Sequence, residues 1–273
     1  MDGLAEVVAL DRDHPGFRDP LYRARRNEIA RAALAYREGD PVPVIEYTDD
    51  EHEVWRTVWA HIDGLHARYA CRAYREASQV LALDRTRIPQ LRDLNVTIAA
   101  ATGFSMLPAA GLMTPRSFLT YLAHNAFLST QYVRHHTRPL YTPEPDVIHE
   151  LVGHAVTLAH RPFAVLNRAF GDAAVQADEE TLLGLIRVYW YTLEFGAVRE
   201  DGALRVYGAG LLSSYGELGR FEEASTLRPF VLDEIAATPF DPTDYQTTIF
   251  VADSWDAMSS SLLAWLGARC RAR

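Results

Sequence analysis

Two histidines in one short run of the sequence are residues of the type that binds a metal ion. The run covers residues 141–154 and reads Tyr-Thr-Pro-Glu-Pro-Asp-Val-Ile-His-Glu-Leu-Val-Gly-His. It places His149 and His154 five positions apart, whereas the helical zinc-peptidase motif needs histidines four positions apart. On an ideal α-helix, side chains five positions apart point about 140° away from one another. The two rings can therefore meet at one ion only if His149 lies at the irregular beginning of its helix.

A metal held by two histidines needs a further ligand from elsewhere in the chain, and Glu194 is the best candidate. It lies between Leu193 and Phe195, where burying a carboxylate is costly unless a cation or a hydrogen-bond donor meets it. Two histidines and one carboxylate form the facial triad of non-haem iron(II) oxygenases, although zinc accepts the same ligands. The alternatives without a metal are a salt bridge from Glu194 to an arginine, and histidines that serve as a cap and a core residue.

The elements that must position these residues are helical. The two prolines of the Pro-Glu-Pro-Asp segment keep the approach extended, and Asp146 can cap a helix that begins near Val147. Apolar residues recur at helical spacing over residues 179–196, which predicts one long helix carrying Glu194.

The rest of the chain also indicates mostly helices. Asp19, followed by proline, is a typical N-cap, and Thr48 with Glu51 forms a capping box. Strand signals are few, and residues 197–207, with Asp-Gly at their centre, predict a small β-hairpin. We therefore expect a mainly α protein, with one domain over residues 1–273, a minor β element and a loosely attached C-terminal tail.

Composition excludes several classes of function. The 273 residues carry a net charge of −9, and all 27 basic residues are arginine, which excludes lysine Schiff-base chemistry and a P-loop. The acidic balance argues against a general nucleic-acid binder, and two cysteines are too few for a disulfide scaffold. No apolar run approaches the roughly 20 residues of a membrane span, and the first residues show no signal-peptide pattern. We expect a cytoplasmic protein without a nucleic-acid or membrane partner.

Several motifs, in chain order, resemble the pterin-dependent aromatic amino acid hydroxylases. They are His-Pro-Gly-Phe-Arg-Asp-Pro at 14–20, Ser-Thr-Gln-Tyr-Val-Arg at 129–134, the run at 141–154, Glu-Phe-Gly at 194–196 and Tyr-Gly-Ala-Gly-Leu-Leu-Ser-Ser at 207–214. The similarity covers about residues 14–254 and implies the helical catalytic domain of that family. We expect no regulatory domain and no tetramerisation helix, and therefore a monomer or a weak dimer.

The resemblance also implies roles for individual residues. The iron ligands would be His149, His154 and Glu194. The amino acid substrate would contact Arg134, which pairs with its carboxylate, and Thr142, Trp190 and Ser213. The pterin would contact Gly111, Leu112, Phe118 and Glu150, with Phe118 stacked on the cofactor. The alternatives are ordinary core positions for the two aromatic residues and a turn position for Thr142.

Two residues depart from the pattern of the family. Leu128 stands where the family usually has a histidine near the iron, and Tyr191 stands where it usually has phenylalanine. The first change removes a hydrogen-bonding group and the second adds a phenol. We expect both residues to face the pocket and to influence which substrate is used or which ring carbon is hydroxylated.

The resemblance implies a monooxygenase that uses iron(II), a tetrahydropterin and dioxygen to hydroxylate the ring of a free aromatic amino acid. Phenylalanine is the expected substrate, because Trp190 matches the phenylalanine and tyrosine enzymes better than the tryptophan enzymes. The product would be tyrosine or meta-tyrosine. Hydroxylation of tyrosine or tryptophan is the alternative. Two more remote alternatives are a zinc hydrolase with Glu150 as base and a binding module without a metal.

Overall fold

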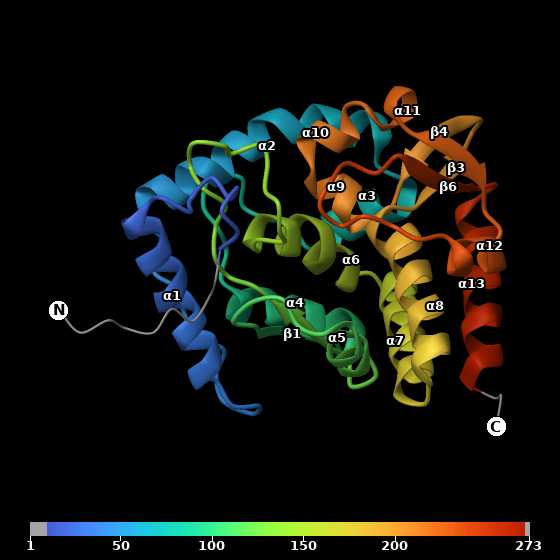
Figure 1. Ribbon diagram of the computed structural model, residues 1–273, viewed down its shortest axis with the longest axis horizontal. Coiled ribbons are helices and arrows are strands. Elements are labelled where there is room, and N and C mark those ends of the chain that lie inside the picture. Colours follow the sequence, from blue (N-terminus) through green and yellow to red (C-terminus); the bar gives the residue numbers. More distant parts are fainter. Residues whose placement is uncertain (1–9, 271–273) are drawn as a thin grey trace.

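The computed structural model describes residues 10–270, and most of them are helical (Figure 1). The helices before the histidine run are α1 (Pro20–Ala35), α2 (Asp49–Tyr69), α3 (Arg72–Val80), α4 (Leu91–Thr102) and α5 (Pro115–Leu122). The later ones are α6 (Val156–Leu158), α7 (Arg161–Val175), α8 (Glu179–Tyr189), α9 (Ala209–Ser213), α10 (Tyr215–Leu218), α11 (Phe221–Ala224), α12 (Leu232–Ala237) and α13 (Trp255–Cys270). The mainly α class expected from the sequence agrees with this arrangement. The expected domain limits at residues 1 and 273, and the N-terminal residues inspected for a signal peptide, lie outside the described residues.

Two further helical segments are π-helices, and six short strands complete the chain. The π-helices are η1 (His149–Ala155) and η2 (Trp190–Glu194). The strands are β1 (Ser105–Pro108), β2 (Ala126–Ser129), β3 (Ala197–Glu200), β4 (Ala203–Val206), β5 (Thr226–Pro229) and β6 (Thr248–Ala252).

The first two helices begin where their capping residues predict. The Asp19 side chain accepts hydrogen bonds from the backbone N–H groups of Leu21 and Tyr22 at the start of α1. At the start of α2, Thr48 and Glu51 each accept a hydrogen bond from the backbone N–H of the other. Both caps satisfy N–H groups that have no partner inside the helix, and both predicted helix starts are confirmed.

The strands form two sheets. β3 and β4 pair antiparallel around Asp201 and Gly202, whose φ angles of 52° and 77° suit a tight hairpin turn. This pair lies in the segment where a hairpin was expected, but it is one edge of a four-stranded sheet in the order β4-β3-β6-β5. β6 runs parallel to both β3 and β5. β1 and β2 form a separate parallel pair, connected through α5.

The end of the described chain is packed against the rest of it. α13 runs beside α7, and α7 also packs on α8, so that these three helices form one side of the molecule (Figure 1). Met258, Leu262 and Leu266 recur at helical spacing on α13, and all three are buried. The expected loose attachment of the C-terminal tail is therefore wrong, because this apolar stripe is covered.

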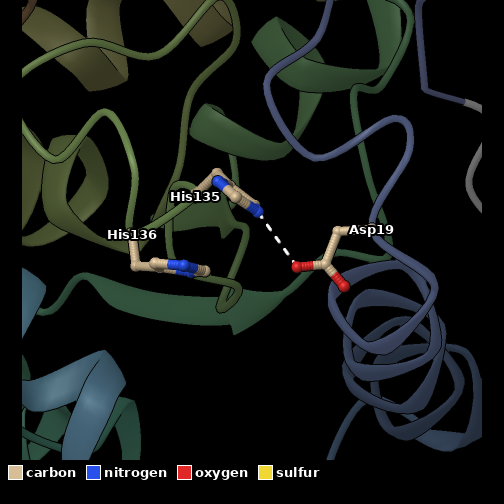
Figure 2. A group of neighbouring side chains, drawn as sticks. All are labelled: Asp19, His135 and His136. Atoms are coloured by element: carbon tan, nitrogen blue, oxygen red, sulfur yellow. Dashed lines mark hydrogen bonds and ion pairs between the residues drawn. The ribbon is translucent and has the colours of Figure 1, made fainter.

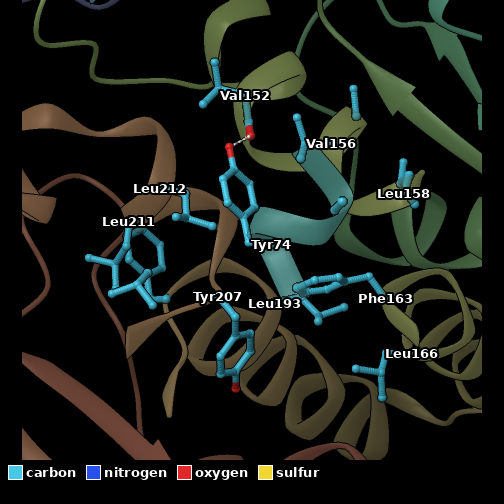
Figure 3. Close-up of a cluster of buried hydrophobic side chains, with 14 of the residues drawn as sticks. Tyr74, Val152, Val156, Leu158, Phe163, Leu166, Leu193, Tyr207, Leu211 and Leu212 are labelled. Carbon is cyan, nitrogen blue, oxygen red and sulfur yellow. Dashed lines mark hydrogen bonds between the residues drawn. The ribbon is translucent and has the colours of Figure 1, made fainter. Parts of the chain in front are cut away.

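The core reaches the backbone of the histidine run. Tyr74 of α3 is buried among residues such as Phe163, Leu193 and Tyr207 (Figure 3). Its hydroxyl donates a hydrogen bond to the carbonyl of Val152 at 2.8 Å, which connects α3 to η1. Over residues 10–270, no helix combines the length and the apolar composition that crossing a bilayer requires.

Candidate active site

The π-helical geometry of η1 brings the two histidines together. The backbone N–H of Val156 donates to the carbonyl of Leu151, five positions earlier, which is the π-helical pattern. In such a helix a residue lies nearly above the one five positions before it, and the rings of His149 and His154, inclined at 81° to each other, bring their Nε2 atoms to 3.1 Å. An irregular beginning of an α-helix was expected here. That expectation is wrong, because the histidines lie in a regular π-helix.

The third candidate ligand, Glu194, also lies in a π-helix. α8 ends at Tyr189, and η2 continues it to Glu194, with the N–H of Phe195 donating to the carbonyl of Trp190 at 2.9 Å. The prediction of a single α-helix over residues 179–196 is therefore wrong for the last turn, which is π-helical. The Glu194 carboxylate lies 3.0 Å from His154 Nε2 and 3.7 Å from His149 Nε2.

Hydrogen bonds prepare these three side chains for a cation. Ser213 Oγ donates to the carbonyl of Ala209 at 2.8 Å and accepts from His149 Nδ1 at 2.9 Å, which leaves His149 Nε2 without a proton. Burial lowers the pKa of His149 to about 4, so its ring stays neutral. Burial also opposes a charge on His154, but the Glu194 carboxylate outweighs it and raises the pKa of that ring. A divalent metal would replace the proton between them, as metal binding to histidine requires.

We expect Ser213→Ala to weaken metal binding because it frees the His149 ring to rotate. Removing a hydrogen-bond partner of a metal ligand costs on the order of 10–100-fold in affinity. The measurement is the dissociation constant of iron(II) or cobalt(II) by titration. Ser78→Ala is the control, because Ser78 makes the same kind of helical bond to the carbonyl of Tyr74 at 2.9 Å. Equal affinity in the Ser213 and Ser78 variants would contradict the role of Ser213.

A glycine allows η1 to pack closely on α9, which carries Ser213. A Cβ atom at Gly153 would lie 2.8 Å from the Cβ and 2.9 Å from the carbonyl oxygen of Ala209, both too close for van der Waals contact. This contact explains the glycine inside the histidine run in structural terms.

Gly153→Ala should therefore push η1 away from α9. Overpacking of this kind costs about 1–3 kcal/mol of unfolding free energy, and we expect weaker metal binding as well. Thermal unfolding and metal titration measure the two effects. Gly64→Ala is the control, because its Cβ would meet nothing within 4 Å in α2, and alanine is favoured by up to about 1 kcal/mol in a helix. A Gly153 variant as stable as the Gly64 variant would contradict the packing argument.

The carboxylates of the Pro-Glu-Pro-Asp segment hold arginines. Asp146 is fully buried and accepts from Arg134 through Nε at 2.9 Å and Nη2 at 2.7 Å. Burial alone would raise the pKa of Asp146, but the adjacent guanidinium outweighs it and holds that pKa below its ordinary value. Glu144 forms an ion pair with Arg26 through a single guanidinium nitrogen, Nη1. These two carboxylates therefore fix the segment before η1 and are not metal ligands.

A cavity of about 490 Å³ opens beside the triad, and its wall is mostly apolar. Besides His149 and Glu194, the predicted residues that line it are Arg134, Thr142, Trp190, Ser213, Leu112 and Phe118. Its size is in the range of small-molecule sites. The structure thus gathers the predicted substrate residues, and part of the predicted pterin segment, around one space next to the triad.

Two of the predicted pterin residues do not line this cavity. Glu150 is buried, and its carboxylate accepts from the N–H and the hydroxyl of Thr130 at 3.2 and 3.1 Å. Burial raises the pKa of Glu150 to about 7. Gly111 lies next to the cavity-lining Leu112, and a Cβ there would meet nothing within 4 Å.

The two residues that depart from the family pattern do not line the cavity either, contrary to expectation. Phe127 turns its ring toward His154, with 4.4 Å between ring centroids, so the next residue on the strand, Leu128, points to the other face. Tyr191 is buried, and its hydroxyl donates to the carbonyl of Pro239 at 2.7 Å. Any influence of Tyr191 on the cavity is therefore indirect, through the segment that follows Pro239.

That segment supplies cavity residues that the sequence did not indicate. Phe240 stacks on Trp190 with ring centroids 4.3 Å apart, and the side chain of Gln246 accepts from Trp190 Nε1 at 2.8 Å. Glu217 of α10 also lines the cavity. Its position, three residues after Ser214, was a signal in the sequence that could have been used. Phe240 and Gln246 carried no such signal in the sequence, because their position depends on how a loop folds back.

Another group of potential metal ligands joins the start of α1 to the two histidines that directly follow Arg134. Asp19, His135 and His136 have ligand atoms within 4.8 Å of one another (Figure 2). Asp19 already caps α1 with one oxygen, and its other oxygen lies 3.2 Å from His135 Nε2, while His135 Nδ1 bonds to Thr137 Oγ1 at 2.7 Å. The hydrogen bonds of Asp19 and His135 are thus explained without a metal.

The fold and the site define a mainly helical protein with a two-histidine, one-carboxylate group suited to a divalent metal. Comparison with known sequences identifies the class further. The chain belongs to the biopterin-dependent aromatic amino acid hydroxylases, since the model of that family matches residues 4–269. The similarity therefore continues well past residue 254, where it was expected to fade.

Individual relatives agree with this membership. Tyrosine 3-monooxygenase of Drosophila melanogaster is 44% identical over 267 residues, which is 96% of this chain and 46% of the relative. Phenylalanine-4-hydroxylase of Rattus norvegicus is 41% identical over 257 residues, which is 92% of this chain and 57% of the relative. The chain thus spans about half the length of these relatives.

A solved structure gives the corresponding match in three dimensions. Phenylalanine hydroxylase of Chromobacterium violaceum, solved with bound iron(III) and 7,8-dihydrobiopterin, superposes with a TM-score of 0.78 and 30% sequence identity. The match covers 88% of this chain and 91% of that one.

Proposed function

We propose that this protein is an iron(II)- and tetrahydropterin-dependent monooxygenase that hydroxylates the ring of a free aromatic L-amino acid. The observation that carries the proposal is the triad of His149, His154 and Glu194 at the edge of a largely apolar cavity that also contains Arg134. A triad leaves coordination positions open, and the cavity offers a cation for a carboxylate and aromatic surfaces for a ring.

Each part of the site has a separate task in this proposal. Iron and the tetrahydropterin, when bound, supply the electrons that reduce dioxygen, so that one oxygen atom enters the substrate ring and the other goes to the pterin. The triad would hold the metal, and Phe118 would pack on the pterin. Arg134 would pair with the substrate carboxylate, and Trp190 with Phe240 would orient its ring. The apolar wall excludes water from the reacting groups.

Phenylalanine is the substrate that we propose. The solved phenylalanine hydroxylase is matched over 91% of its own length, and the cavity wall beside the triad carries aromatic rings. Tyrosine is the second candidate, because the Drosophila relative is named a tyrosine 3-monooxygenase. We also propose that the chain forms one catalytic domain, which the continuous core from α2 to α13 supports.

Turnover with defined components tests the proposal. The purified protein is supplied with iron(II), tetrahydrobiopterin and oxygen, and with phenylalanine, tyrosine or tryptophan, and the products are separated by chromatography. We expect a hydroxylated amino acid that requires both iron and pterin, with the highest kcat/KM for phenylalanine. No product from any of the three amino acids, or activity that survives removal of iron, would refute the proposal.

A further inference from the structure

The cavity contains a carboxylate that the proposed chemistry does not use. Glu217 lies on α10, and its Oε1 accepts a hydrogen bond from the backbone N–H of Gln246 at 2.8 Å. Within the described part of the chain, no arginine or histidine nitrogen comes within 4.0 Å of this carboxylate to form an ion pair. Glu217 is thus an unpaired acid on the wall of a ligand cavity.

An unpaired carboxylate in such a place is costly, and a cationic ligand group would remove the cost. Burial raises the pKa of Glu217 to about 7, and the more distant charges of Arg220 and Asp244 act in opposite directions. Carboxylates removed from water are normally paired. Glu217 has hydrogen bonds with Gln246 and Ser214 but no cationic partner, and such a perturbed acid in a cleft is a candidate for binding a cation of the ligand.

Contacts along the cavity wall connect Glu217 to the residue proposed to bind the substrate carboxylate. Arg134 is held by Asp146, whose Oδ1 accepts from the backbone N–H of His149 at 3.2 Å. His149 in turn contacts Ser213 at 2.9 Å, and Ser213 lies four positions before Glu217. One guanidinium and one carboxylate therefore both line the cavity beside the triad.

From this arrangement we propose that Glu217 binds the α-ammonium group of the amino acid substrate while Arg134 binds its α-carboxylate. The assignment rests on the proposed function, because it assumes an amino acid in the cavity. The two charged groups of an amino acid are attached to the same carbon atom, so two opposite charges in one cavity can fix that carbon and thereby orient the ring toward the metal. Glu217 would thus select zwitterionic amino acids over aromatic acids that lack the amino group.

The decisive variant is Glu217→Gln, which keeps the shape and the acceptor for Gln246 but removes the charge. For phenylalanine we expect KM to rise about 10–100-fold, since a hydrogen bond between charged groups is worth about 1.5–3 kcal/mol. The inhibition constant of 3-phenylpropionate, which lacks the ammonium group, should stay the same or become lower. The KM of the pterin should not change. Glu217→Asp, which keeps the charge, should retain part of the preference for phenylalanine over 3-phenylpropionate. The control is Glu223→Gln, because Glu223 is an exposed carboxylate on α11.

The outcomes separate this assignment from the proposed function. If Glu217→Gln weakens the binding of phenylalanine and of 3-phenylpropionate equally, or weakens the binding of neither, Glu217 does not bind the ammonium group. If the unmodified protein hydroxylates no aromatic amino acid, the proposed function fails. Calorimetric titration of the same two ligands into both proteins then decides the assignment by itself. Absence of phenylalanine binding to the unmodified protein would overturn it.

Discussion

The Glu194→Ala protein is expected to lose both stoichiometric iron binding and hydroxylation. Removal of a partner of a metal ligand already costs on the order of 10–100-fold, so removal of a ligand should lower turnover by more than about a hundred-fold. The fold should persist, because the change removes a carboxylate whose burial is itself unfavourable. Metal analysis after desalting, turnover and thermal unfolding together measure these effects.

Glu180→Ala is the matched control for this experiment. Glu180 is an exposed acid in the first turn of α8, the helix that continues into η2. That variant should bind one equivalent of iron and retain full activity. One equivalent of iron and normal turnover in the Glu194 variant would refute the triad.

The second large effect concerns Arg134. Its Nε and Nη2 atoms bind Asp146, so only a planar group with several donors can hold that carboxylate and still face the cavity. Arg134→Lys keeps the charge but has a single nitrogen. We expect the KM of the amino acid to rise about 10–100-fold, and the unfolding temperature to fall because a buried pair loses hydrogen bonds.

The KM of the pterin is the internal control for Arg134→Lys, and Arg56→Lys on the surface of α2 is the matched variant. An amino acid KM that stays unchanged would remove Arg134 from the substrate site. A parallel rise in the KM of both ligands would show a general distortion of the cavity instead.

The candidate ligands were predictable from the sequence because residue type and context carry the signal. His149, His154 and Glu194 are groups that are rarely buried without a partner, and they stood among apolar residues. Their convergence was not predictable from helical periodicity. It depends on a π-helical hydrogen-bond pattern, which is stabilised by the contact between Gly153 and Ala209, distant in sequence.

The other predictions from the sequence that the structure contradicts also have local causes. Met258, Leu262 and Leu266 recur at helical spacing, so the packing of the C-terminal helix was predictable from the sequence. Leu128 was placed at the cavity from its position in a motif, although strand alternation lets only one of two neighbouring residues face the triad. The sheet beyond the hairpin could not be derived, because β5 and β6 join strands from distant parts of the chain.

The π-helix η1 has the spacing of an α-helix into which one residue has been inserted. Deletion of Gly153 would give His-Glu-Leu-Val-His, the four-position spacing that an ordinary α-helix places on one face. The same two histidines are thus a single deletion away from the ligand spacing of a zinc peptidase. Because the π-helix accommodates the extra residue, a change to an ordinary α-helix would leave the later residues, such as Val156 and Leu158, in phase with the core. The five-position spacing of the histidines and the π-helical hydrogen bonds are therefore two consequences of one extra residue.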